Sequence, residues 1–272
     1  MITIYCINCD QPKRIEIDQI KKGQFVICEK CDENFNLFGI YNFLYNSVSL
    51  AKNIVDILVL AVYGRSHFVG KETDLQIIDQ FRKTSDFDSL LGDIVFDTIL
   101  FGNAFIEKVE EDEGLLKRID PISIEIVTSW KQRPPRRSFS EEIDKLIQHI
   151  PTKKEIPRSN IFHFIGENIT EPIGTSVLGF WFDDWYRVVF FKESPRKSFI
   201  ESNVVGASGA PHHLIFPEER YSNAFKKRDL TTFQWVIKSR RRKIRKVIER
   251  EILPMVLERP FDRKETPKFE FI

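Results

Sequence analysis

Four cysteine residues have the types and spacing most suited to chemistry. They form two pairs, Cys6 with Cys9 in CINC and Cys28 with Cys31 in CEKC, and eighteen residues separate the pairs. Paired Cys-x-x-Cys at this separation is typical of a zinc ribbon, in which four thiolates bind one Zn²⁺ ion tetrahedrally. Four thiolates fill the coordination shell, so the metal would be structural and have no position open to water. Four buried or reactive cysteines without a metal are the alternative, which the paired spacing disfavours.

The segment between the two pairs must bring them together. Residues 11–27 alternate apolar and polar side chains and pass through Lys22-Gly23. Alternation around such a turn predicts a β-hairpin. We therefore place a zinc ribbon at residues 1–38. The sequence leaves open whether this ribbon contacts nucleic acid, contacts protein, or only folds the terminus.

The composition indicates a folded protein. Of 272 residues, 42% are hydrophobic and 12% aromatic, which is enough to bury a core and excludes overall disorder. The net charge of +1 balances 41 basic against 40 acidic residues. The N-terminus lacks a basic region followed by an apolar run, and the most apolar window, IVDILVLAVYG, is too short to span a bilayer. We expect a soluble, intracellular protein without a membrane partner.

Three helices are expected upstream of a break at Gly102-Asn103. Apolar residues at helical spacing predict them over residues 40–63, 71–84 (with Thr73 as the candidate N-cap) and 86–101. Glycine accepts left-handed geometry and asparagine tolerates it, so the third helix is expected to end at Gly102-Asn103. The chain should turn there into a strand that carries Glu107.

The rest of the chain mixes strands and helices. Alternating residues predict strands over residues 104–129, around a turn at Glu113-Gly114, and over residues 156–166. Three more helices are predicted: a short one over residues 140–150 capped by Ser140, one buried on most sides over residues 177–194, and a long basic one over residues 229–257 with Pro254 as a candidate kink. The predicted fold class is therefore α+β.

No recognisable catalytic motif is present. The sequence has no phosphate-binding P-loop, no Gly-rich nucleotide fingerprint and no Gly-x-Ser-x-Gly elbow. We interpret Asp183-Asp184 as the polar edge of a helix and His212-His213 as a loop pair, rather than as metal sites. His163 lies in an apolar strand and is interpreted as a hydrogen-bonded core residue rather than a catalytic base. We predict no catalytic residue and no enzymatic activity.

Four motifs in order resemble the core of tailed-virus portal proteins. They are FGNAFIEK, RIDPISIEIV, IPRSNIFHF and EPIGTSVLGF, and the resemblance extends over roughly residues 54–271. In that family a helix ends in an aromatic-Gly-Asn-Ala-aromatic step. A strand that contains Ile-x-His follows, and then a helix that begins with Gly-x-Ser-x-Leu. The matching residues, to which the resemblance gives structural roles, are Gly102, Asn103, Glu107, Pro121, His163, Gly174 and Ser176.

The resemblance implies a ring of about a dozen subunits at one vertex of a viral capsid. Double-stranded DNA would pass through the ring during packaging and ejection. The implied partners are the terminase large subunit, the major capsid protein and a head-tail adaptor. The protein itself would be found in the virion and, during assembly, in the host cytoplasm. The portal-like core would cover residues 39–272, with residues 119–164 as an inserted, strand-rich, motor-facing segment. The zinc ribbon lies outside the common core, and the chain is short for the family.

Basic residues of the long helix are the candidate DNA contacts. Eleven Lys and Arg residues lie between Lys226 and Arg250, against only Asp229 and Glu249. In a ring the same patch repeats around the axis, and phosphate contacts need no particular base sequence. The candidates are Lys238, Arg240, Arg241, Arg242, Lys243, Arg245 and Lys246. Alternatively, these residues face solvent or a neighbouring subunit, or the chain is a non-viral zinc-ribbon protein that binds nucleic acid as a monomer or dimer.

Overall fold

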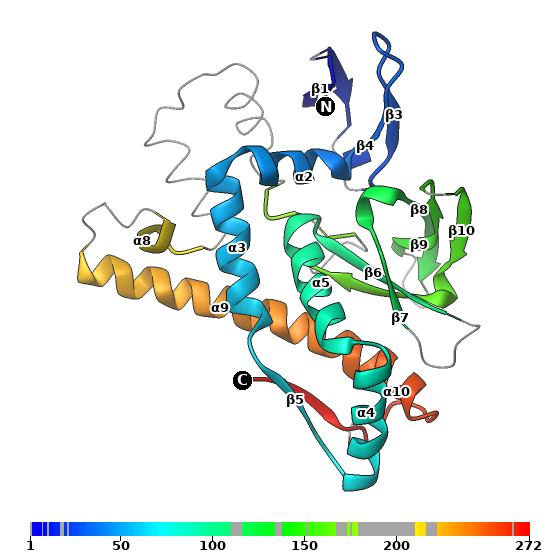
Figure 1. Cartoon of the computed structure of the whole chain (residues 1–272), viewed down its shortest axis with the longest axis vertical. Coiled ribbons are helices and arrows are strands. Elements are labelled where there is room, and N and C mark those ends of the chain that lie inside the picture. The colour runs from blue at the N-terminus through cyan, green and yellow to red at the C-terminus, as the bar shows by residue number, and fades with distance from the viewer. Residues whose placement is uncertain are drawn as a thin grey trace.

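The computed structural model describes residues 2–6, 8–9, 11–16, 19–20, 22–109, 116–133, 138–150, 152–166, 173–174, 176–178, 210–215, 222–262 and 264–272. These residues form an α+β protein, as predicted. Two small N-terminal β-hairpins precede a body of helices and small antiparallel sheets (Figure 1). The turn predicted at Glu113-Gly114 lies outside the described residues, as does nearly all of the helix predicted over residues 177–194.

The N-terminal unit contains two hairpins, one for each cysteine pair. β1 (Ile2–Tyr5) pairs with β2 (Pro12–Ile15), and β3 (Phe25–Ile27) pairs with β4 (Asn34–Asn36), both antiparallel. The single hairpin predicted between the pairs is therefore wrong. Each Cys-x-x-Cys segment is itself a tight turn, so the strands pair across it. Gly23, at φ 61°, makes a turn between the hairpins instead.

The first long apolar stretch forms two helices rather than one. α2 (Phe38–Ser47) and α3 (Ser49–Tyr63) meet at Val48, whose backbone is extended, and their axes differ by 104°. The predicted single helix over residues 40–63 is therefore wrong. Both helices bury apolar side chains, so the periodicity continues through the bend and does not reveal it. No single helix within the described residues is long and apolar enough to cross a bilayer, and only this bent pair meets those criteria together.

Two further helices, α4 (Glu72–Thr84) and α5 (Phe87–Leu100), lie where the sequence predicts them. Lys71 occupies the N-cap position of α4, so Thr73 lies inside the first turn and is not the cap. β5 (Ser66–Val69) precedes α4 and pairs with the C-terminal strand β12 (Lys268–Phe271).

Two three-stranded antiparallel sheets form the middle of the chain. The first has the order β11-β6-β7 and consists of Ile161–Ile165, Asn103–Lys108 and Leu116–Ile119. The second has the order β10-β9-β8 and consists of Lys154–Pro157, Ser138–Gln148 and Ile124–Arg133. Short 3₁₀ turns, η1 (Pro121–Ser123) and η2 (Arg158–Asn160), lead into β8 and β11. The strands predicted in these two regions are present.

Strand β9 occupies the segment predicted to be a helix capped by Ser140. The helical pattern came from Ile143 and Leu146, which lie three residues apart and are both buried. A register shift places Ile143 opposite Thr128 and Leu146 opposite Ile126, with one extra residue between them. This β-bulge brings both side chains to the same face of the sheet, which imitates helical spacing.

The long basic helix starts earlier than predicted. α9 (Asn223–Val247) continues through a π-helical turn, η4 (Ile248–Ile252), into the short α10 (Leu253–Val256). The Ser222 hydroxyl caps its start by accepting a hydrogen bond from the Phe225 N–H at 3.2 Å. The wider π-helical turn lies next to Pro254, which lacks the N–H needed to continue the α-helical hydrogen bonds. The position predicted as a kink is therefore a change in helical turn.

The core lies between the helices and the first sheet. α3 and α5 run side by side and α9 crosses them, while α2 lies beneath the N-terminal hairpins (Figure 1). Large apolar side chains fill the interior, and the fully buried ones include Phe38, Phe87, Phe105, Phe164 and Phe269. α8 (His212–Ile215) packs near α3, so His212-His213 belongs to a short helix rather than to a loop.

Candidate functional site

The four predicted metal ligands meet at one point. The sulfurs of Cys6 and Cys31 lie 3.6 Å apart and those of Cys9 and Cys28 lie 3.5 Å apart. All four sulfur atoms lie within 4.8 Å of one another. A disulfide bond requires about 2.05 Å between sulfurs, so the four cysteines are free thiols. The two hairpins therefore bring the two predicted pairs into one four-cysteine cluster.

The geometry of this cluster fits a tetrahedral metal ion. Zn–S bonds of about 2.3 Å place the sulfurs of a tetrahedron about 3.8 Å apart. The distances of 3.5 and 3.6 Å are close to that edge length. The backbone N–H of Lys30 hydrogen-bonds to Cys28 and lowers the pKa of its thiol to about 6. The pKa values of Cys9 and Cys31 are raised instead, because burial and the neighbouring thiols outweigh the backbone hydrogen bonds from Gln11 and Glu33. The tetrahedral spacing of the four sulfurs is therefore what fits one Zn²⁺ ion without an open position.

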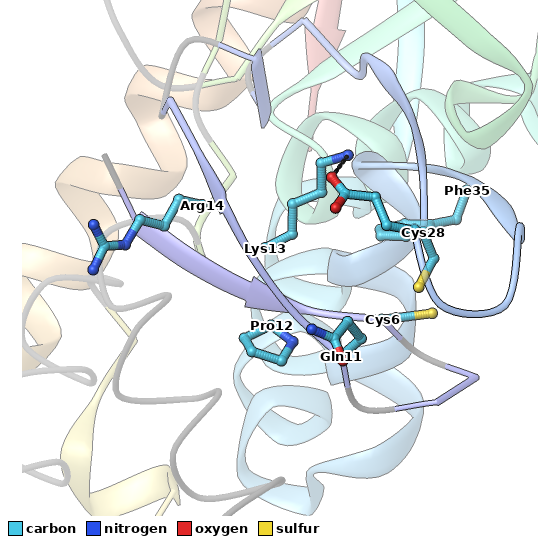
Figure 2. A pocket seen from close by; sticks show the side chains of 8 residues that line it. Cys6, Gln11, Pro12, Lys13, Arg14, Cys28 and Phe35 are labelled. Atoms are coloured by element: carbon cyan, nitrogen blue, oxygen red, sulfur yellow. Dashed lines mark ion pairs between the residues drawn. The ribbon is translucent and has the colours of Figure 1, made fainter.

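A hollow of about 240 Å³ lies beside the cluster. Figure 2 shows Cys6 and Cys28 at one side of it, with the side chains of Gln11, Pro12, Lys13, Arg14 and Phe35 around it. Glu29 also lines the hollow. The Lys13 ammonium donates a hydrogen bond to the Ile27 carbonyl at 2.9 Å and lies 4.0 Å from the Glu29 carboxylate. Lys13 therefore ties the first hairpin to the second beside the four-cysteine cluster.

Five of the seven family-motif residues meet where α5 turns into β6. We call this group, Gly102, Asn103, His163, Gly174 and Ser176, the helix-to-strand corner. Gly102 has φ 78°, in the left-handed region that glycine accepts. A Cβ atom on Gly174 would lie only 1.9 Å from the Gly102 carbonyl oxygen, so the close approach requires glycine there. The corner predicted at Gly102-Asn103 is present.

The Asn103 side chain joins the segments of this corner. Its Oδ1 atom accepts hydrogen bonds from the Gly174 N–H at 2.8 Å and from His163 Nε2 at 2.9 Å. Its Nδ2 atom donates to the Gly174 carbonyl at 3.1 Å. Asn103 is completely buried. One amide therefore fixes β6, β11 and the chain at residue 174 relative to one another.

His163 is a neutral core residue. Its ring stacks on that of Phe105, with 4.6 Å between centroids and 10° between planes. Burial lowers the pKa of His163 to about 3. The neutral ring donates its Nε2–H to Asn103, so the second nitrogen carries no proton. The structure thus gives His163 the hydrogen-bonded role that the sequence suggested.

The remaining motif residues hold turns and sheets. The Ser176 hydroxyl donates to the Leu100 carbonyl at the end of α5 and accepts from the Leu178 N–H at 3.0 Å. Pro121 opens η1, the turn that leads into β8. Glu107 lies away from the corner, where its carboxylate is 2.6 Å from the Lys154 ammonium and links β6 to β10.

Three of the seven candidate DNA contacts point into the protein. Arg240 is only 4% exposed. Arg241 donates hydrogen bonds to the Ala61 and Val62 carbonyls at 3.1 Å and to the Ile272 carbonyl at 3.3 Å. It thereby satisfies carbonyls at the end of α3. Lys243 donates to the Gly166 carbonyl at 2.5 Å.

Three other candidates form a continuous row on the surface. Lys238, Arg242 and Lys246 are exposed and are spaced four residues apart, so they lie on one face of α9. Trp235, which is 69% exposed, extends this face toward the start of the helix. We call Lys238, Arg242 and Lys246 the basic row. Arg245 is half-buried beside it.

Two polar residues that organise the fold were missed by sequence reasoning. Asp97 is fully buried in α5, and Arg118 of β7 donates to both of its carboxylate oxygens, at 2.7 and 2.8 Å. Asn36 at the end of β4 is also buried and hydrogen-bonded. The only signal for Asp97 was a lone acid within an apolar helix face.

The other candidate metal residues do not form a second site in the described part of the chain. Among the described residues, the four cysteines are the only group of three or more His, Cys, Asp or Glu side chains that could hold a metal ion. His213 Nδ1 lies 3.3 Å from an Asp229 carboxylate oxygen, which pairs α8 with α9. Asp183-Asp184 lies outside the described residues.

Comparison with known proteins gives a structural likeness. No known protein family matches the sequence, and no curated protein is detectably similar to it. A chain in the neck of a native gene transfer agent (GTA) particle, computed with C12 symmetry, matches with a TM-score of 0.52 and 11% identity, over 93% of this chain and 88% of that one. A chain of the native GTA virion matches with a TM-score of 0.52 and 10% identity, over 91% and 85%. The protein thus shares the fold of a chain found in the neck of a phage-like particle.

Proposed function

We propose that the protein is the portal subunit of a phage-like particle and forms a ring that conducts double-stranded DNA. The observation that carries this proposal is the likeness to a GTA neck chain across nearly the full length of both chains. The helix-to-strand corner supports it independently, because the residues that meet there are those of the portal motifs. The C12 symmetry of the GTA neck is consistent with about twelve subunits in the ring.

The proposed role is structural rather than enzymatic. Its partners would be double-stranded DNA, further copies of the chain, the terminase large subunit, the major capsid protein and a head-tail adaptor. The protein would be found in the virion and, during assembly, in the host cytoplasm. Residues 119–164, which contain the sheet of β8, β9 and β10, would form the segment that faces the packaging motor.

We propose that the four-cysteine cluster holds a structural Zn²⁺ ion. The two short hairpins have strands of only three or four residues, which do not form a stable unit in water by themselves. Metal binding to four thiolates supplies folding free energy to such small units. Elemental analysis of the purified protein should give one zinc per chain, and Cys28→Ser should abolish it.

The basic row is the proposed contact with DNA phosphates. Its three cations are exposed, whereas Arg240, Arg241 and Lys243 are engaged inside the protein. A ring would repeat the row around the channel, which suits contact with DNA of any sequence. Contact with a neighbouring subunit is the alternative role for these cations.

The size and shape of the assembled protein test the portal proposal. Twelve times the 32.1 kDa chain gives about 385 kDa, which light scattering or native mass spectrometry of the zinc-loaded protein resolves from a monomer or dimer. Negative-stain images should show rings with a central hole. A monomer or dimer that still binds DNA would favour a zinc-ribbon nucleic-acid-binding protein and contradict the portal proposal.

Salt dependence tests the DNA contact. The triple variant K238A/R242A/K246A should bind duplex DNA more weakly and with a shallower dependence on salt, because each lost phosphate contact removes about 0.9 from the slope. The matched control K71A/K83A/K153A removes three exposed lysines from other parts of the surface. Equal binding and equal salt slopes for the two variants would assign the basic row to another role.

A further inference from the structure

The N-terminal hairpins cover an open edge of the second sheet. β8 is an edge strand in the order β10-β9-β8. The Ile126 N–H, on the side away from β9, donates to the Lys22 carbonyl at 2.8 Å. The Ile124 carbonyl on the same edge accepts a hydrogen bond from Asn36 Nδ2 at 2.6 Å. Residues of the ribbon therefore satisfy two backbone groups that an uncovered edge would leave open.

Asn36 is the residue that connects the ribbon to this edge. It lies at the end of β4 and is 3% exposed. Its Nδ2 atom donates to the Gly23 carbonyl at 2.6 Å as well as to Ile124, and its Oδ1 atom accepts from the Phe38 N–H at 2.7 Å. A single side chain therefore links the ribbon turn, the sheet and the start of α2.

Packing reinforces the same contact. The Phe25 ring of β3 lies 4.1 Å from the His149 ring, which follows β9. Gly23 lies between the Phe38 ring and the Ile124 carbonyl, where an added Cβ would be 2.4 Å from the ring. In Figure 1 the lower end of the β3–β4 hairpin reaches the segment that leads into β8. The hairpin and the sheet thus form one interface.

Two of the four proposed metal ligands belong to the hairpin that makes this interface. β3 and β4 have three residues each and enclose Cys28 and Cys31. Without a bound ion, strands this short do not hold a fixed hairpin in water. The position of Asn36 against β8 therefore depends on the cluster that closes the other end of the same hairpin.

We propose that zinc occupancy controls the sheet of β8, β9 and β10 through Asn36, so that the ribbon is a metal-dependent clamp on the edge of β8. This inference rests on the proposed zinc site and is independent of ring formation. Loss of the ion would release Asn36 and the Lys22 carbonyl from β8. The freed edge would then exchange its amide hydrogens with solvent and become available for pairing with other chains.

Hydrogen exchange detected by mass spectrometry tests the clamp on the full chain. The readout is a peptide covering residues 122–128, and a peptide covering residues 103–108 of β6 is the internal control. Three samples are compared: the zinc-loaded protein, the protein after chelation, and zinc-loaded Asn36→Ala. Asn46→Ala is the matched variant, because Asn46 is exposed on α2 and its side-chain hydrogen bonds within the described residues go to Asn42 of the same helix.

The clamp predicts faster exchange of the Ile126 amide, by about tenfold or more, after chelation and in Asn36→Ala, with β6 unchanged. Asn36→Ala should still bind one zinc ion. Faster exchange in this variant therefore comes from the lost Asn36 contact and not from loss of the metal. Exchange as slow as in the native protein in zinc-loaded Asn36→Ala would overturn the inference. If the β8 amides exchange as slowly after chelation as before it, the clamp does not depend on zinc. If chelation also speeds amide exchange in β6, the loss of metal has loosened more than the edge of β8. The exchange of zinc-loaded Asn36→Ala then tests the clamp by itself.

Discussion

Replacing Asn103 with alanine should destabilise the protein strongly, although no charge or large apolar group is lost. Asn103→Ala removes the acceptor for the Gly174 N–H and for the His163 Nε2–H, and the donor to the Gly174 carbonyl. All of these groups lie in the buried corner. An orphaned buried polar group costs about 1–3 kcal/mol, so three of them cost up to about 9 kcal/mol.

Water that enters the space left by the amide would recover part of this loss. We therefore expect the free energy of unfolding to fall by about 3–6 kcal/mol, out of roughly 5–15 kcal/mol for a typical domain. Thermal unfolding of the zinc-loaded chain measures this, and the midpoint should fall by on the order of 10 °C. Asn46→Ala is the control, because its exposed amide bonds to Asn42 of the same helix. Its loss should change stability by less than about 0.5 kcal/mol.

Asn103 and His163 should be energetically coupled, because their side chains hydrogen-bond to each other. His163→Phe removes the N–H donor that Asn103 Oδ1 accepts. The double variant with Asn103→Ala should therefore be less destabilised than the two single variants added together, because each change removes the group that the other leaves unpaired. Two results would refute the argument. One is an Asn103→Ala protein that melts within about 2 °C of the native chain, and the other is strict additivity in the double variant.

Three further variants or conditions test the corner and the basic helix. Gly102→Val should lower the melting temperature and impair assembly, because a β-branched residue resists φ 78°, whereas Gly92→Ala in α5, where an added Cβ meets nothing closer than 3.6 Å, should be tolerated. Acid should weaken the fold through His163. Its pKa of about 3 lies below the unfolded value of about 6.5, so the unfolded state takes up the proton first, and stability is lost as pH falls below about 6.5. About 2 kcal/mol should be lost by pH 5, and comparing urea unfolding of the native chain with His163→Gln, which should lack this component, checks it. Arg241→Ala should cost about 1–3 kcal/mol in denaturant unfolding because it orphans carbonyls at the end of α3, whereas its exposed neighbour Arg242→Ala should leave stability within about 0.5 kcal/mol.

The features that the sequence predicted depend on local geometry. The four cysteines could be grouped because each Cys-x-x-Cys turn aims two sulfurs at one point whatever the rest of the chain does. The end of α5 could be placed because Gly102 is the residue type that accepts left-handed geometry after a helix. The order of the four motifs added the remaining corner residues, His163, Gly174 and Ser176, which no local rule connects to Asn103.

The features that were missed depend on partners far along the chain. Strand β9 carries a local helical pattern, and only its pairing with β8 and the bulge between them explain why Ile143 and Leu146 share a face. The bend at Val48 is hidden because apolar periodicity continues on both sides of it. Asn36 looks like an ordinary turn residue, and its buried bond to Ile124 spans 88 positions in the sequence.

The basic run on α9 shows why charge counted along a sequence overstates a nucleic-acid surface. Arg241 and Arg242 are adjacent and chemically identical, yet one satisfies backbone carbonyls of α3 and the other is exposed. A variant that replaced Arg240, Arg241 and Arg242 together would lose DNA affinity if the row bound DNA, and also if the protein merely lost its packing. Restricting the substitutions to Lys238, Arg242 and Lys246 removes this ambiguity, because these side chains are exposed. Weaker DNA binding in that variant, at an unchanged melting temperature, would therefore report on phosphate contact alone.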